Sequence, residues 1–193
     1  MSLGVASHAT ETLDEALQAV LEAAAQYARA PLTSDEGSPC SLAEDRFARL
    51  AEAVSRASFV RDWELRYRII IPEPTPSNNV IKGMQRFAYR DLRRTWRDYV
   101  WVGLKGRLPK QPLSSARVVI NRHCNGALDW DNAFGGLKVL FDCLVVPTDR
   151  NPDGLGLITD DNPVAMPEPP YLRQIKARRG KGFTECLIYA ARR

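Results

Sequence analysis

The spacing of apolar residues changes near residue 64, and this change constrains the fold more than any other feature. Between Leu13 and Ala24 the apolar residues recur at three- and four-residue steps, which is typical of an amphipathic helix. Between Leu65 and Ile71 they alternate until Pro72 ends the run, which predicts a strand. A chain that begins with helices and continues with strands and helices in turn is expected to be of the α/β (α+β) class.

The segments after residue 64 predict a mixed sheet with the element order β-α-β-α-β-β. The first strand is followed by an expected helix over 84–104, a strand over 116–124, a helix over 132–144 and a short extended piece over 155–159. Two further strands are expected over 171–177 and 183–190. A basic, glycine-containing segment joins these two strands, so we expect them to form a terminal hairpin.

Residues 1–60 predict a two-helix extension, which precedes a domain formed by residues 61–193. Thr12 with Glu15, and Ser41 with Glu44, have the spacing of a helix-capping box. The stretch 31–39 between them is rich in Ser, Gly and Asp and is bounded by prolines, which predicts a linker. We expect an αα hairpin that packs on the following domain or on a protein partner.

Charge is distributed unevenly between these two parts of the chain. Residues 1–60 hold four arginines and nine acidic residues, whereas the remainder holds 23 lysines and arginines and 14 acidic residues. A basic domain with an acidic extension indicates a polyanionic partner for the domain, such as DNA.

Five arginines recur at three- and four-residue steps on one side of the predicted 84–104 helix. They form either a solvated helix face or a ridge that contacts phosphates, and we favour the ridge because the guanidinium fork matches phosphate oxygens. The expected hairpin tip adds three more cations. The candidate backbone contacts are Arg86, Arg90, Arg93, Arg94, Arg97, Arg178, Arg179 and Lys181.

Several classes of protein are disfavoured by the composition. No run approaches the roughly 18 apolar residues that cross a bilayer, and the N-terminus lacks the basic start and apolar segment of an export signal. Four scattered cysteines disfavour a zinc site or a disulfide framework and indicate reduced thiols. Two distant histidines disfavour a hydrolase triad. We therefore expect a cytoplasmic protein without membrane association.

Acidic residues mark both ends of the stretch 129–161. It opens with Asp129 and Asp131 and closes with Asp160 and Asp161. Oxygen ligands suit Mg²⁺, which completes its shell with water and substrate phosphate. These four residues are therefore candidate ligands for Mg²⁺, or for Mn²⁺ in its place. Each pair also has a structural interpretation, as a helix N-cap at 131–132 and as a turn at 160–163.

One cation, Lys138, lies inside this acidic stretch. On a continuous helix it shares a face with Asp131 and Gly135, and its ammonium points back toward Asp131. Such a cation would offset charge on phosphoryl oxygens during phosphodiester hydrolysis. Gly135 and Gly136 either let a phosphate backbone or another chain approach closely, or mark an irregular start before a regular helix from Leu137.

Residues 149–160 also match the template of a calcium-binding loop, with Asp in place of the final Glu. Such a loop requires an exit helix, which Pro163, Pro167, Pro169 and Pro170 forbid. The calcium interpretation is therefore the weaker one.

Three segments taken in order resemble the RusA-type Holliday junction resolvases. The segment 74–79, Pro-Thr-Pro-Ser-Asn-Asn, resembles the Pro-Ser-Asn-Asn loop that follows the family's first strand. The segment 129–144 resembles the family's block of Asp-x-Asp-Asn, Lys and Phe/Leu-Asp-x-Leu, and 159–161 resembles the Asp-Asp pair that follows it. The agreement covers about 64–190 and leaves residues 1–60 outside.

This resemblance implies a homodimeric, Mg²⁺-dependent endonuclease that cuts four-way DNA junctions. By match, the catalytic residues are Lys138, Asp129, Asp131 and Asp161, and the metal ligands are Asp129, Asp131 and Asp161 with Asp160 beside them. Asn78, Asn79 and Lys82 are added to the candidate DNA contacts. Two other classes stay open: a DNA-binding protein that keeps the fold without catalysis, and a calcium-binding module.

Overall fold

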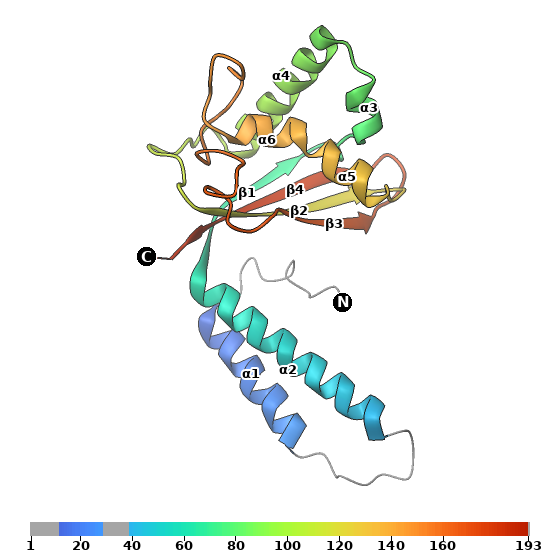
Figure 1. Ribbon diagram of the computed structural model, residues 1–193, viewed down its shortest axis with the longest axis vertical. Coiled ribbons are helices and arrows are strands. Elements are labelled where there is room, and N and C mark those ends of the chain that lie inside the picture. The colour runs from blue at the N-terminus through green and yellow to red at the C-terminus, as the bar shows by residue number, and fades with distance from the viewer. Residues whose placement is uncertain (1–11, 29–38, 193) are drawn as a thin grey trace. The chain divides into compact units, whose positions relative to one another are not determined.

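The computed structural model describes residues 12–28 and 39–192 (Figure 1). The chain divides into two compact units. The first comprises residues 1–64 with the C-terminal residues 192–193, and the second comprises residues 65–191.

The first unit contains two helices, α1 (Leu13–Ala28) and α2 (Pro39–Asp62), which pack against each other. The capping box predicted at the start of α1 is confirmed: the Thr12 backbone N–H donates to Glu15 Oε2 at 2.7 Å, and the Glu15 N–H donates to Thr12 Oγ1 at 3.3 Å. The second predicted box is wrong, because α2 already begins at Pro39 and Ser41 therefore lies within the helix. Most of the predicted linker lies outside the described residues.

The second unit is built on a four-stranded mixed sheet, so the predicted α/β (α+β) class is confirmed. Its strands are β1 (Trp63–Ile71), β2 (Ala116–Cys124), β3 (Tyr171–Lys176) and β4 (Phe183–Ala191), in the spatial order β1-β4-β2-β3. Strand β2 pairs antiparallel with β4 and parallel with β3. It is buried over most of its length, which explains why this β-branched segment takes a central position.

The predicted terminal hairpin is wrong. Strands β3 and β4 follow each other in sequence but lie on opposite sides of β2. Their connection passes the end of β2, where the Ala177 N–H donates to the Cys124 carbonyl oxygen at 2.9 Å. The extended piece expected over 155–159 is not a strand of the sheet. It forms one isolated bridge, between Leu113 and Ile158, and its other backbone hydrogen bonds go to the end of α6 and the residue after it.

Four helices lie on one face of the sheet (Figure 1): α3 (Asn78–Lys82), α4 (Arg86–Gly103), α5 (Trp130–Gly136) and α6 (Lys138–Leu144). The core between helices and sheet includes Ile69, Trp96, Val118, Ile120 and Leu140, each at most 1% exposed. Among the described residues, no helix is long and apolar enough to cross a membrane.

The segment predicted as a helix over 132–144 is helical, but it is not one continuous helix. It breaks at Leu137, which ends α5 and precedes α6, close to the start at Leu137 given as the alternative. The predicted 74–79 loop also ends in a helix, because Ser77 Oγ accepts the Val80 N–H and caps α3.

Candidate functional site

A pair of glycines joins the loop after β1 to helix α5. A Cβ atom on Gly136 would overlap the carbonyl oxygen of Pro76, and one on Gly135 would overlap the Asn78 side chain. The Asn79 N–H also donates to Asn132 Oδ1 at 3.2 Å. The interpretation that the glycines admit a phosphate backbone or another chain is therefore wrong, because the chain's own loop fills that space.

The other end of the same loop is held by buried polar groups that the sequence analysis missed. Arg122, 7% exposed, donates from Nε to the Thr75 carbonyl oxygen at 3.0 Å, and its Nη1 lies 3.4 Å from the Gly126 carbonyl oxygen. The Thr75 N–H donates to Thr184 Oγ1 at 3.0 Å. The signal in the sequence was an arginine among the alternate positions of β2 that are otherwise apolar, namely Ala116, Val118, Ile120 and Cys124.

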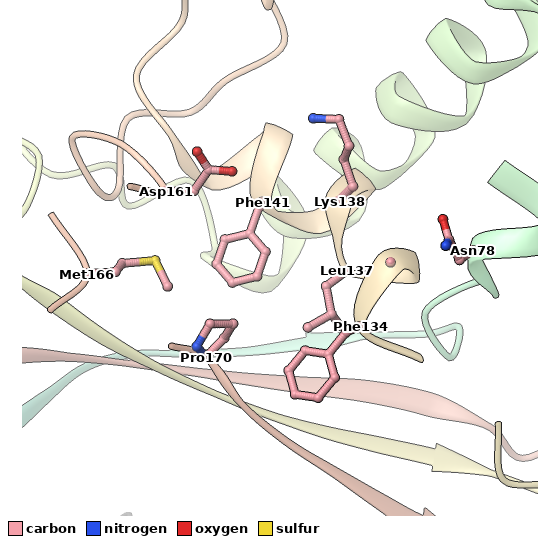
Figure 2. Close-up of a pocket in the computed structure, with 9 residues that line it drawn as sticks. Asn78, Phe134, Leu137, Lys138, Phe141, Asp161, Met166 and Pro170 are labelled. Carbon is pink, nitrogen blue, oxygen red and sulfur yellow. The ribbon is translucent and has the colours of Figure 1, made fainter. Parts of the chain in front are cut away.

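A cavity of about 380 Å³ opens where this loop, helices α5 and α6, and the segment after residue 159 meet (Figure 2). Three polar side chains line it: Asn78 from α3, Lys138 from α6 and Asp161. The rest of its lining comes from Phe134, Gly135, Leu137, Phe141, Met166 and Pro170. The three segments that carry the sequence resemblance, far apart in the chain, thus contribute to one cavity.

The two acidic residues of the 159–161 segment have different surroundings. Asp160 caps its own turn: Oδ1 accepts the Asp161 N–H at 2.8 Å, and Oδ2 accepts from Asn162 Nδ2 at 2.7 Å. Asp161 lines the cavity instead. Partial burial and a hydrogen bond with the Asp160 carboxyl raise the pKa of Asp161 above its ordinary 3.8, an effect that the Lys138 ammonium opposes.

Asp129 and Asp131 lie at the start of α5. Asp129 is its N-cap, and its two carboxylate oxygens accept from the Asn132 N–H and Nδ2, each at 2.9 Å. These hydrogen bonds lower the pKa of Asp129. Asp131 is exposed in the first turn. Neither residue is part of the cavity lining.

The predicted carboxylate cluster is not preassembled. Within residues 12–28 and 39–192, no three His, Cys, Asp or Glu side chains form a group that could hold a metal ion. The residues present therefore do not fit a closed, all-protein metal site.

Lys138 belongs to a polar network between α4 and α6. Its ammonium lies 2.9 Å from Asp142 Oδ1, so the expectation that it points back toward Asp131 is wrong, and the break at Leu137 explains why. The Tyr89 hydroxyl donates to Asp142 Oδ2 at 2.7 Å. Burial, followed by this hydrogen bond, raises the pKa of Tyr89.

Arg93 is part of the same network. Its side chain is 11% exposed, and Nε donates to Asp153 Oδ2 at 2.7 Å while Nη1 lies 3.9 Å from Asp142 Oδ2. Although it is mostly buried, Arg93 also lines a surface cavity with Arg86 and Arg90, so its contact with DNA stays a prediction. Asp153 is one of the acids in the calcium-loop template. Because Asp153 is ion-paired with Arg93, this acid is engaged within the fold.

The other predicted cations remain at the surface. Arg86 and Arg90 line a second cavity of about 470 Å³ together with Arg150 and Phe87, and the Arg90 guanidinium lies 5.3 Å from the centre of the Phe87 ring. Arg94 is exposed, and Arg97 is partly exposed beside Asp98. Exposed cations also lie at the end of α3 and in the β3–β4 connection: Lys82, Arg178, Arg179 and Lys181.

Comparison of this chain with protein-family models, with curated proteins and with solved structures gives no match.

Proposed function

We propose that this chain is a Mg²⁺-dependent endonuclease that hydrolyses phosphodiester bonds in branched DNA. One observation carries the proposal: the loop after β1, helices α5 and α6, and the 159–161 segment converge on one cavity that presents Asn78, Lys138 and Asp161. These are the three segments that resemble RusA-type resolvases in sequence. Their convergence supports reading them as parts of one site.

The cation in the cavity and the exposed cations on the helix behind it support a polyanionic substrate. Arg86, Arg90 and Arg94 lie exposed on α4, the helix that packs on α6. Lys138 supplies a cation at the cavity itself, where it would stabilise charge on a phosphoryl oxygen. Asp161 adds a carboxylate at the same cavity.

Mg²⁺, or Mn²⁺ in its place, would supply Lewis acidity and an activated water when bound with the DNA. Mg²⁺ needs only one or two protein carboxylates when phosphate and water complete its shell. The proposed ligands are therefore Asp161 in the cavity and one of Asp129 and Asp131. The proposal further includes a homodimer, a cytoplasmic location and a protein partner for the acidic extension of residues 1–60.

The test is cleavage of a labelled four-way junction beside a linear duplex of the same sequence, in Mg²⁺ and in EDTA. We expect Mg²⁺-dependent nicking of the junction alone. Lys138→Met should lower the rate about 100-fold, the usual effect of removing one group that stabilises transition-state charge. Lys110→Met, at an exposed lysine outside the cavity, is the matched control and should cleave normally.

Asp161→Asn should abolish cleavage while retaining junction binding. Tight binding without any cut by the wild type, in either Mg²⁺ or Mn²⁺, would refute the enzyme and favour a DNA-binding protein. Folding that depends on Ca²⁺, without affinity for DNA, would favour the calcium-binding module.

A further inference from the structure

The cavity beside Lys138 and Asp161 has an apolar floor that phosphodiester hydrolysis does not require. Leu137, Phe141 and Met166 are 2–6% exposed and close its inner side, while the Phe134 ring is 42% exposed at its mouth (Figure 2). A half-exposed aromatic ring above an apolar floor provides a stacking surface for a flat ligand.

The rim of the cavity is polar and chemically varied. The Asn78 amide offers two donors and one acceptor, Asp161 offers carboxylate oxygens, and Lys138 offers a cation. Its volume of about 380 Å³ lies near the lower end of the range of about 300–1,000 Å³ for small-ligand sites. Apolar walls, hydrogen-bonding groups and one cation together match a single nucleoside with its phosphate.

A second aromatic ring extends this surface beyond the cavity. Trp130 is 62% exposed, and its ring centre lies 5.9 Å from that of Phe134 at an interplanar angle of 37°. Large exposed aromatic rings on a basic protein are typical of surfaces on which unpaired bases stack.

We propose that this cavity binds one unstacked nucleoside of the DNA substrate, with its base against Phe134 and its phosphate toward Lys138. The inference rests on the proposed function and names the feature of the substrate that the site recognises. A base in an intact duplex is stacked and paired, so it must leave the helix before it can enter. Branch points, where stacking is interrupted, meet this requirement at the lowest cost.

The test measures binding without cleavage, in EDTA or with Ca²⁺ in place of Mg²⁺. Two labelled duplexes are compared, one with a single extrahelical nucleotide and one with an abasic residue at that position. We expect the wild type to bind the first about tenfold more tightly, within the range that loss of one base–aromatic stack produces. Phe134→Ala should abolish this preference.

Two further variants make the measurement specific. Phe134→Leu keeps an apolar side chain but removes the ring, so it should lose most of the preference while folding normally. Phe87→Ala removes an aromatic ring on α4 that is more exposed (67% against 42% for Phe134) and lies outside this cavity, so it should retain the tenfold preference.

Equal affinity of the wild type for both duplexes would overturn the inference. The inference would also be overturned if Phe134→Ala lost the same amount of affinity for both duplexes. A change in oligomeric mass with no change in DNA affinity would overturn it too, because it would indicate that a second copy of the chain fills the cavity. If the protein cleaves junctions but shows no preference for the duplex with the extra base, the proposed endonuclease is supported and the base-binding site is rejected. If it shows the preference but cleaves no junction, the base-binding site is supported and the endonuclease is rejected.

Discussion

Substitution of Gly136 by alanine tests whether the loop after β1 is clamped on helix α5. In a helix, alanine in place of glycine would by itself stabilise by about 1 kcal/mol. Here the added methyl group would overlap the Pro76 carbonyl oxygen, which is backbone and does not rotate away. Overpacking of this kind typically costs about 1–3 kcal/mol, and the upper end applies against backbone. We expect a net destabilisation of about 2 kcal/mol, which is the upper end of about 3 kcal/mol less the gain of about 1 kcal/mol.

The assay is urea unfolding followed by circular dichroism, with the midpoint compared at equal slope. Gly126→Ala is the matched control, because a Cβ atom there meets nothing within 4 Å. That substitution should be neutral or stabilising by up to about 1 kcal/mol. If Gly136→Ala were as stable as the wild type, the packing of the Pro76 loop on α5 would be refuted. In the expected case junction cleavage falls as well, since the displaced loop carries Asn78.

Two further predictions concern carboxylates that are paired with other side chains in the fold. Arg93→Met should lower the free energy of unfolding by about 3–5 kcal/mol because it leaves the buried Asp153 carboxylate unpaired. The control Arg94→Met, at an exposed arginine, should change it by no more than about 0.5 kcal/mol. Equal unfolding midpoints in urea for the two variants would contradict this prediction. Burial alone would raise the pKa of Glu185, but hydrogen bonds, including the one from Asn121, lower it below its ordinary 4.5. Its stabilising contribution is therefore present above pH 4.5 and lost as pH falls through the lowered value. Glu185→Gln should have a lower free energy of unfolding than the wild type at pH 7, and the difference between the two should decrease as the pH is lowered. A difference that does not change with pH would refute this prediction.

Local patterns in the sequence were sufficient for the fold class and for most elements. Alternating apolar residues predicted β1, a run of β-branched residues predicted β2, and the Thr12 capping box predicted the start of α1. All three signals depend on residues close in sequence. Strand pairing joins residues that are distant in sequence. The order of β3 and β4 along the chain therefore could not predict that they lie on either side of β2.

For the candidate site, too, some features followed from the sequence and others from the tertiary structure. The sequence by itself determined which residue types were available: the acidic pairs, the lysine between them, the asparagine loop and the arginines of α4. Only the tertiary structure decided which of them meet. It brought Asn78, Lys138 and Asp161 to one cavity, committed Asp160 to its own turn, and placed Arg93 in a buried ion pair. The physical reason is that burial and ion pairing depend on which distant segments pack together. The glycines at 135 and 136 set that packing by leaving room for the Pro76 loop.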